Sequence, residues 1–241
     1  MHLRTATPDV PDVRDRIYDP ALVPLPARMV PVVRPEHVLD QRAEGACTGF
    51  ALAAAIGHLA RRAGRTFEPS PRMLYEMARR CDEWPGETYD GSSLRGAIRG
   101  FKNHGVCSMA EWPYVPGRPG RLTVRRARAA RATTIGAYYR VRPIVSDVHA
   151  ALAEAGVVVM SAEVHGGWNR VRDVIPHRRR TDGAHAFAVV GYDARGFFVQ
   201  NSWGPSWGRG GVALWRYEDW ADHVMDAWVL RLALPTPQIF G

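Results

Sequence analysis

The sequence predicts an α+β protein in which a mostly helical first half packs directly against a mostly β-stranded second half. Between residues 46 and 103 the apolar residues recur at helical spacing, whereas between residues 157 and 217 they form short runs separated by turn-forming residues. Hydrophobic residues make up 46% of the 241-residue chain, which is enough to fill a substantial core. A cleft between the two halves is the expected place for a functional site.

Three helices are expected in the first half. The first covers about residues 46–62 and carries two arginines in its last turn, where cations interact favourably with the helix dipole. The second begins with Ser70 as its N-cap and Pro71 at its first position. The third covers about residues 93–103 and ends at Gly105, because glycine readily takes the left-handed conformation that stops a helix.

The second half reads as one short helix near residues 146–156 followed by strands. The expected strands are VVVMSAEV, AHAFAVVGYD, GFFVQNSW and GVALWRY, with a tight turn at DARG. We therefore divide the chain into an N-terminal arm at 1–30, a helical lobe at 31–130, a β-rich lobe at 131–232 and a C-terminal tail at 233–241. The arm is rich in proline and charge and shows little periodicity, which predicts an extended segment.

The charge of the chain does not point to a nucleic-acid partner. The net charge is +8, and the basic residues are densest in RRARAAR and HRRR. Lys102 is the single lysine, so this charge reflects a general preference for arginine codons more than a binding surface. No aromatic RNA-binding motif or zinc-finger spacing accompanies the arginines, and we expect no nucleic acid, metal or other cofactor.

The cysteine content and the absence of long apolar runs indicate the compartment. No run approaches the roughly 18 apolar residues of a membrane span, and the first 30 residues lack the layout of a secretory signal. Three cysteines, Cys47, Cys81 and Cys107, are too few and odd in number for a disulfide framework. We expect free thiols and a cytoplasmic protein with no membrane partner, while the oligomeric state stays open.

One cysteine stands where a nucleophile would be activated. Cys47 falls in the first turn of the first expected helix, where the positive end of the dipole favours the thiolate. Gln41 lies six residues earlier in a polar loop, from which its amide and the Cys47 backbone N–H can stabilise an oxyanion. The alternative is that Cys47 is simply a small buried hydrophobic residue.

A histidine and an asparagine supply the base that such a nucleophile needs. His185 lies in the apolar strand AHAFAVVGY, and Asn201 lies at the end of the next strand along the chain. The side-chain oxygen of an asparagine can fix the tautomer and orientation of an imidazole. A histidine that is only part of the core is the alternative interpretation.

These residues together resemble the papain family of cysteine peptidases. The resemblance rests on Gln41, on Cys47 in EGAC, on His185, and on the run NSWGPSWG that begins at Asn201. Cys47 precedes His185 by 138 residues and Asn201 by 154, close to the separations of about 130–150 seen in the family. The segments DGSSLRGAIRGFKNHGVCSMAEWPY and PDVRDRIYDP are similar to its helical half and to the opening of bacterial members, so the likeness extends over about residues 8–232.

The resemblance implies a papain-like two-lobed fold and an endopeptidase that works through a thioester. Cys47 would be the nucleophile, His185 the acid and base, Asn201 its orienting partner and Gln41 part of the oxyanion hole. The residues implied in substrate binding are Gly91, Ser92, Ala184 and Trp203. Two alternatives stay open, namely a transpeptidase or other acyltransferase that uses the same site, and a catalytically silent module that only binds a peptide.

Three positions depart from the family pattern. Glu44 stands where the family usually has a disulfide cysteine, and Thr48 replaces the tryptophan that follows the nucleophile. Ala184 replaces the aspartate or asparagine that often precedes the histidine. The first two losses also occur in bacterial intracellular relatives, which agrees with a reducing compartment.

The arm raises the question of how activity is restrained. It contains five prolines and no sustained helical period, so it cannot form the helical pro-segment that blocks secreted members of the family. We expect the chain to be catalytically assembled without N-terminal cleavage and to be restrained by narrow choice of a protein or peptide substrate, or by a separate inhibitor or activating partner. Cys47 should then react with thiol reagents faster than Cys81 or Cys107.

Overall fold

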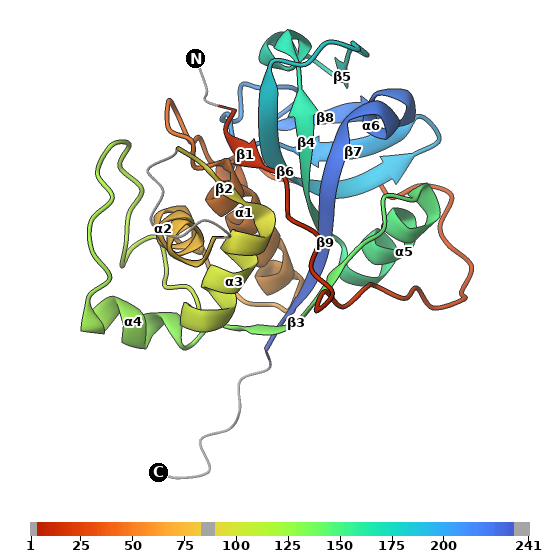
Figure 1. Ribbon diagram of the computed structural model, residues 1–241. Coiled ribbons are helices and arrows are strands. Elements are labelled where there is room, and N and C mark those ends of the chain that lie inside the picture. Colours follow the sequence, from red (N-terminus) through yellow and green to blue (C-terminus); the bar gives the residue numbers. More distant parts are fainter. Residues whose placement is uncertain (1–3, 83–89, 234–241) are drawn as a thin grey trace.

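The computed structural model describes residues 4–82 and 90–233. The helices of the first half lie on one side of the molecule, the large sheet lies on the other, and the short strand β1 (Ala6–Thr7) runs between them (Figure 1). The expected tail at 233–241 falls, except for residue 233, outside the described residues. The arrangement is the expected α+β fold, with helical and β-rich parts packed directly together.

The helical part is built from four helices. They are α1 (Cys47–Arg62), α2 (Pro71–Cys81), α3 (Leu94–His104) and α4 (Val124–Ala130). The predicted cap at Ser70 is present, because its side chain accepts the N–H of Met73, and Ser93 accepts the N–H of Gly96 in the same way. Gly105 ends α3 with φ of 68°, as its position in the sequence predicts.

The β-rich part is one seven-stranded sheet in the order β3-β9-β4-β6-β7-β8-β5. Its strands are β3 (Ile135–Arg140), β4 (Val158–Val164), β5 (Val174–Ile175), β6 (Gly183–Asp193), β7 (Gly196–Gln200), β8 (Val212–Arg216) and β9 (Val224–Leu232). Neighbouring strands are antiparallel except β5 and β8. The other helices described are α5 (Val145–Ala155) and α6 (Tyr217–His223), and there are two 3₁₀ turns, η1 (Pro35–His37) and η2 (Gly166–Arg170).

Strand β6 joins two hydrophobic cores. Its alternate residues Ala186, Ala188 and Val190 pack with α1 and α3 in the core between sheet and helices. Phe187 and Val189, which point the other way, pack with α5 and the tryptophans of the β-rich part. Because both faces of β6 are buried, most of its residues are apolar, and they form the continuous apolar run seen in the sequence.

The arm at 4–30 crosses the molecule instead of leaving it. Residues Ala6–Thr7 form β1, which pairs in parallel with β2 (Ser92–Ser93) of the helical part. The arm then meets β3 through a bridge between Ile17 and Arg140. It returns to the sheet where Met29 pairs with Tyr192 of β6. The arm is extended, as expected, and it contacts both parts of the fold.

Candidate active site

Cys47 is the first residue of α1 and lies against the sheet. Its side chain is fully buried, and the backbone N–H groups of Ala186 on β6, Thr5 in the arm, Thr48 and Cys47 itself lie near its sulfur. Burial raises the pKa of the Cys47 thiol to about 11, although these N–H groups favour the thiolate and oppose that rise. The thiol is therefore neutral while the arm is in place.

His185 and Asn201 are in direct contact. The His185 Nε2 atom lies 2.7 Å from the Asn201 Oδ1 atom, and both residues are buried. The N–H of Ser202 donates to the same oxygen at 2.7 Å, which identifies that atom as the amide oxygen. Because this oxygen only accepts, His185 carries its hydrogen on Nε2. The Trp203 ring lies beside the imidazole, with ring centres 4.8 Å apart, and shields it from water.

Gln41 is held in a fixed position in front of α1. Its Oε1 atom accepts the hydroxyl of Ser202 at 2.6 Å, and its Nε2 atom donates to the Glu44 carbonyl at 2.9 Å. The Gln41 backbone N–H donates to the Ser202 carbonyl at 2.9 Å. Since Ser202 follows Asn201, these bonds tie the loop before Cys47 to the segment that carries the asparagine.

Glu44, which departs from the family pattern, forms a buried ion pair. Its two carboxylate oxygens accept hydrogen bonds from Arg72 of α2 at 2.5 and 2.7 Å, and the Arg72 side chain is fully buried. Tyr114 donates its hydroxyl to both Glu44 and the Gln41 carbonyl. Burial opposes ionisation of Glu44, but the bonds from Arg72 and Tyr114 outweigh it and lower its pKa. This ion pair cross-links the Gln41 loop to α2.

The arm lies across the site between the two parts. Ala6 pairs with Ser92 on the helical side, and Thr5 forms a parallel bridge with Ala184 on the β side. The Ala184 N–H points at the Arg4 carbonyl at 3.4 Å. Figure 1 shows β1 running between β2 and β6. An extended peptide thus bonds to both walls of the cleft.

Two glycines make room for this peptide. A Cβ atom at Gly91 would lie 1.9 Å from the Thr5 carbonyl oxygen, and one at Gly45 would lie 2.3 Å from the Thr5 hydroxyl. Gly91 also has φ of 107°, a conformation that other residues rarely adopt. Gly91 therefore accepts no larger residue with the arm in place, and at Gly45 the Thr5 hydroxyl would have to move.

All four residues predicted to bind substrate contact the arm or lie beside it. Gly91, Ser92 and Ala184 meet its backbone, and Trp203 lies under the Arg4 guanidinium, 5.8 Å from its ring centre. The sequence did not predict that the arm itself lies over Cys47. Residues 4–7 are extended, and Cys47 beneath them is fully buried. Sequence reasoning missed Arg4 and Thr5, whose short alternating run RTAT is too brief to predict a strand.

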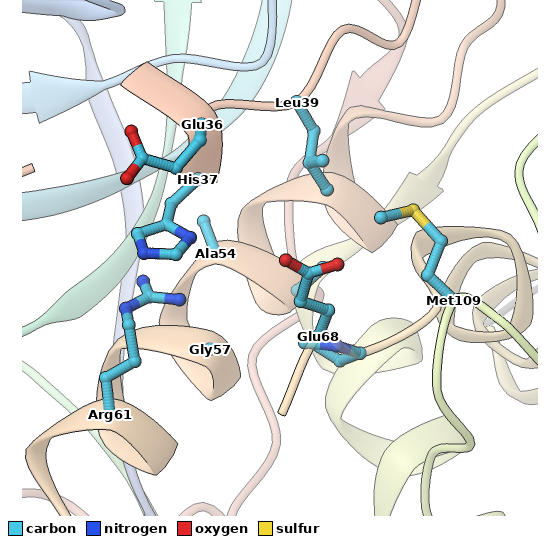
Figure 2. Close-up of a pocket in the computed structure, with 10 residues that line it drawn as sticks. Glu36, His37, Leu39, Ala54, Gly57, Arg61, Glu68 and Met109 are labelled. Carbon is cyan, nitrogen blue, oxygen red and sulfur yellow. The ribbon is translucent and has the colours of Figure 1, made fainter. Parts of the chain in front are cut away.

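The pocket in Figure 2 is separate from this site. It lies beside the later turns of α1, between η1 and the loop that precedes α2, with Arg61 extending toward His37. Its volume of about 30 Å³ is room for one or two water molecules, so it cannot hold a peptide.

The cysteines, the lengths of the helices and the grouping of possible metal ligands are also visible in the structure. Cys47, Cys81 and Cys107 are all free. Within residues 4–82 and 90–233, no helix is both long and apolar enough to cross a bilayer. The same part of the chain contains no group of three or more histidine, cysteine or acidic side chains arranged to hold a metal ion.

The sequence is similar to those of known proteins over much of its length. Residues 30–222 match the papain family of cysteine proteases. The barley cysteine proteinase EP-B 1 is 30% identical over 187 residues, which is 72% of this chain and 48% of the barley protein. Mouse cathepsin K is 29% identical over 197 residues, covering 73% of this chain and 55% of its own. The chain thus spans about half the length of these two relatives.

Solved structures share the fold. Xylellain, a cysteine protease from Xylella fastidiosa, superimposes with a TM-score of 0.85 at 29% identity, covering 97% of this chain and 99% of its own. A Carica candamarcensis cysteine protease in complex with E-64 has the same fold, with a TM-score of 0.67 at 21% identity over 86% of this chain and 99% of its own. With the sequence match over residues 30–222, this agreement establishes that the chain belongs to the papain family of cysteine proteases.

Proposed function

We propose that this chain is an endopeptidase that cleaves peptide bonds through a thioester formed on Cys47. The observation that supports this most directly is the 2.7 Å hydrogen bond between His185 and Asn201, one residue along β6 from the N–H that contacts the Cys47 sulfur. Cys47 lies at the N-terminus of α1 and packs with the strand that carries the oriented imidazole, which is a setting suited to thiol catalysis.

The reaction follows from these positions. His185 takes the thiol proton as the Cys47 sulfur attacks the scissile carbonyl carbon, and the resulting oxyanion is stabilised by the Gln41 amide and the Cys47 backbone N–H. His185 then returns the proton to the nitrogen of the leaving amine as the C–N bond breaks, which leaves a thioester. Water, deprotonated by His185, hydrolyses that thioester and restores the thiol. Asn201 keeps the imidazole oriented through both steps.

The path of the arm supports an endopeptidase over an enzyme that trims chain ends. Residues 4–7 pass over Cys47 without interruption and bond to Ala184 on one side and Ser92 on the other. A substrate peptide of similar length would therefore extend on both sides of the nucleophile. We propose that such a peptide bonds to β2 through its main chain, as the arm does.

The test is cleavage of a peptide library by the full-length chain carrying Arg4→Ala, which loosens the arm, with products identified by mass spectrometry. We expect Cys47→Ala to abolish cleavage, His185→Ala to lower kcat/KM by about 10²–10⁴-fold, and Asn201→Ala to lower it less, because only orientation is lost. Cys81→Ala is the matched control and should leave cleavage unchanged. Cleavage that survives Cys47→Ala would refute the proposal.

The same experiment addresses the two alternative activities. If an added amine appears at the new carboxyl end in preference to water, the enzyme is an acyltransferase. If peptides bind but none is cut, the chain is a peptide-binding module. The cytoplasmic location stays a proposal, and the three free thiols support it.

A further inference from the structure

Arg4 occupies a formed binding site at one end of the cleft. Its guanidinium makes an ion pair with Asp182 and donates to the Asn169 Oδ1 atom at 2.5 Å. The guanidinium also lies over the Trp203 ring. The Arg4 side chain is only 6% exposed, whereas Asp182 is 53% exposed. A surface segment has thus placed a charged side chain in a site that encloses it.

The three partners of Arg4 come from separate parts of the β-rich half. Asn169 belongs to η2, Asp182 immediately precedes β6, and Trp203 follows β7. Together they offer a carboxylate, an amide oxygen and an aromatic face. A planar guanidinium satisfies all three at once, whereas a lysine ammonium lacks the flat surface that stacks on the ring.

This site lies on the leaving-group side of the nucleophile. His185 must hand its proton to the departing amine, so the residue that follows the scissile bond lies beside His185. Trp203 lies against the imidazole, and Asp182 is three residues before it in the chain. The acyl half of a substrate then extends the other way, along β2.

The arm runs through the cleft in the direction opposite to a productive substrate. From Arg4 to Thr7 it passes from Trp203 toward β2, with Ala6 opposite Ser92. A substrate must run from β2 toward Trp203 for its leaving amine to face His185. Because its direction is reversed, the arm covers Cys47 without being a substrate. The Arg4 side chain at the same time fills the leaving-group site.

We propose that Asp182, Asn169 and Trp203 form a subsite that selects arginine as the residue immediately after the scissile bond, and that Arg4 is its internal occupant. This rests on the proposed peptidase function. An ion pair with a half-exposed carboxylate, one amide bond and one stacking contact should favour arginine over neutral residues by about 5- to 30-fold in kcat/KM.

The experiment compares peptides that differ only at the residue after the cleaved bond, which is arginine, lysine, citrulline, alanine or glutamate. The enzyme is the full-length chain with Arg4→Ala, which leaves the subsite unoccupied. Citrulline keeps the shape of arginine and removes its charge, so the arginine-to-citrulline ratio of kcat/KM measures the electrostatic contribution. We expect arginine to be cleaved best, lysine next, and citrulline and alanine about 5- to 30-fold less well than arginine.

Substitution of the carboxylate tests its role directly. Asp182→Asn should bring the arginine-to-citrulline ratio close to 1 with little effect on the alanine peptide, and Asp182→Arg should favour the glutamate peptide. Asp173→Asn is the matched control, because Asp173 is 57% exposed, pairs with Arg209 and lies in the same half of the molecule. It should preserve the arginine preference.

Two results would overturn the inference, and both differ from failure of the proposed function. Cleavage that depends on Cys47 but shows no preference for arginine after the bond would refute the subsite alone. An arginine preference that survives Asp182→Asn would show that other residues select it. If no peptide is cut in a Cys47-dependent way, the peptidase function itself is refuted.

Discussion

Two neighbouring stretches of the arm are held in very different ways. We call residues 4–7 the lid segment and residues 9–18 the anchor segment. The lid segment bonds through a two-residue strand, one bridge and the ion pair of Arg4 with a half-exposed carboxylate. In the anchor segment, Asp9 is 6% exposed, accepts the Arg95 N–H at 2.9 Å and accepts the Trp228 indole N–H at 2.7 Å.

The anchor segment also carries ion pairs to both halves of the molecule. Asp15 pairs with Arg95 of α3 and with Arg140 of β3. Arg140 in turn pairs with Asp226 of β9 at 2.6 Å, and the Asp226 carboxylate accepts the Asp9 N–H. These groups are largely buried, so removing one partner leaves another without its bond in a poorly solvated place.

The difference shows that the arm combines a stable attachment with a weakly held cover. The lid segment is only four residues long and attaches through a two-residue strand and one bridge, so it can open locally without global unfolding. The anchor segment keeps the lid segment close to the cleft, so that reclosure is an intramolecular step at an effective concentration in the millimolar range, about 10⁻³ M. A substrate must therefore compete with the lid segment, which stays attached to the same molecule.

Breaking the anchor should have the largest effect on stability. We expect Asp9→Ala to lower the free energy of unfolding by about 2–4 kcal/mol, because the Arg95 and Trp228 N–H groups lose their buried acceptor. Urea unfolding measures this directly. Asp19→Ala, at an exposed site in the same arm, should stay within about 0.5 kcal/mol of the unsubstituted chain. Equal effects of the two substitutions would contradict the comparison.

Breaking the lid should change activity instead of stability. A chain that begins at Pro8 lacks the lid segment and keeps the anchor segment. We expect its kcat/KM for peptides to exceed that of the full chain by about 10- to 100-fold, which corresponds to a closing free energy of about 1.4–2.7 kcal/mol. The urea midpoint should move little. Unchanged activity would mean that the lid segment does not restrain the enzyme.

The rate at which the thiols react also tests whether the lid segment is weakly held. In the full chain Cys47 is fully buried and its pKa is raised by burial, whereas Cys81 is partly exposed. The sequence favoured Cys47 as the fastest thiol, but its burial reverses that order in the full chain. We expect iodoacetamide to label Cys81 first in the full chain and Cys47 first in the chain that begins at Pro8, with a change of about tenfold in their relative rates. Peptide mapping of the labelled protein reads out both rates. Fast labelling of Cys47 in the intact chain would show that the cover is rarely closed.

The smallest effect concerns pH and the anchor. Burial, with the nearby Asp226 carboxylate, raises the pKa of Asp9 to about 6, against the hydrogen bonds that favour its charged form. The folded chain therefore holds this proton more tightly than the unfolded chain. The resulting stabilisation is complete below about pH 4 and is lost as the pH rises through about 6.

Asparagine at position 9 does not titrate, so Asp9→Asn serves as the reference. Between pH 4 and pH 7, the stability of the unsubstituted chain relative to Asp9→Asn should fall, on the order of 1–2 kcal/mol. Urea unfolding at a series of pH values gives this difference. A difference that grows with pH would reverse the sign and refute the assignment.

Local signals explain which elements the sequence predicted. Helices α1, α2 and α3 were predicted because each combines helical periodicity with a clear start or stop, such as Ser70 or Gly105. Strands β4, β6, β7 and β8 were predicted from apolar runs separated by turns. The sequence did not predict β9, because its polar Asp226 is buried only through partners from distant segments. The short strand β3 and helices α4 and α6 also lacked clear signals.

The site shows the same division between local and distant causes. The chain positions of Cys47, His185 and Asn201 indicated the candidate site, and the structure brings His185 and Asn201 into contact. The ion pair between Glu44 and Arg72 could not be predicted, because the sequence around each residue gives no sign that the two side chains meet. The lid segment could not be predicted either, because two residues in a strand give no periodic signal.

The order in which the residues are synthesised affects when the lid segment docks. The lid segment is synthesised before Ser92 and long before Ala184, the residues that hold it. Bringing such distant segments together costs loop-closure entropy, so this contact forms only after β6 has joined the sheet. We therefore expect a newly folded molecule to pass through a stage in which Cys47 is in place but the lid segment does not yet cover it. Peptide cleavage should be fastest during that stage and should slow as the lid segment docks.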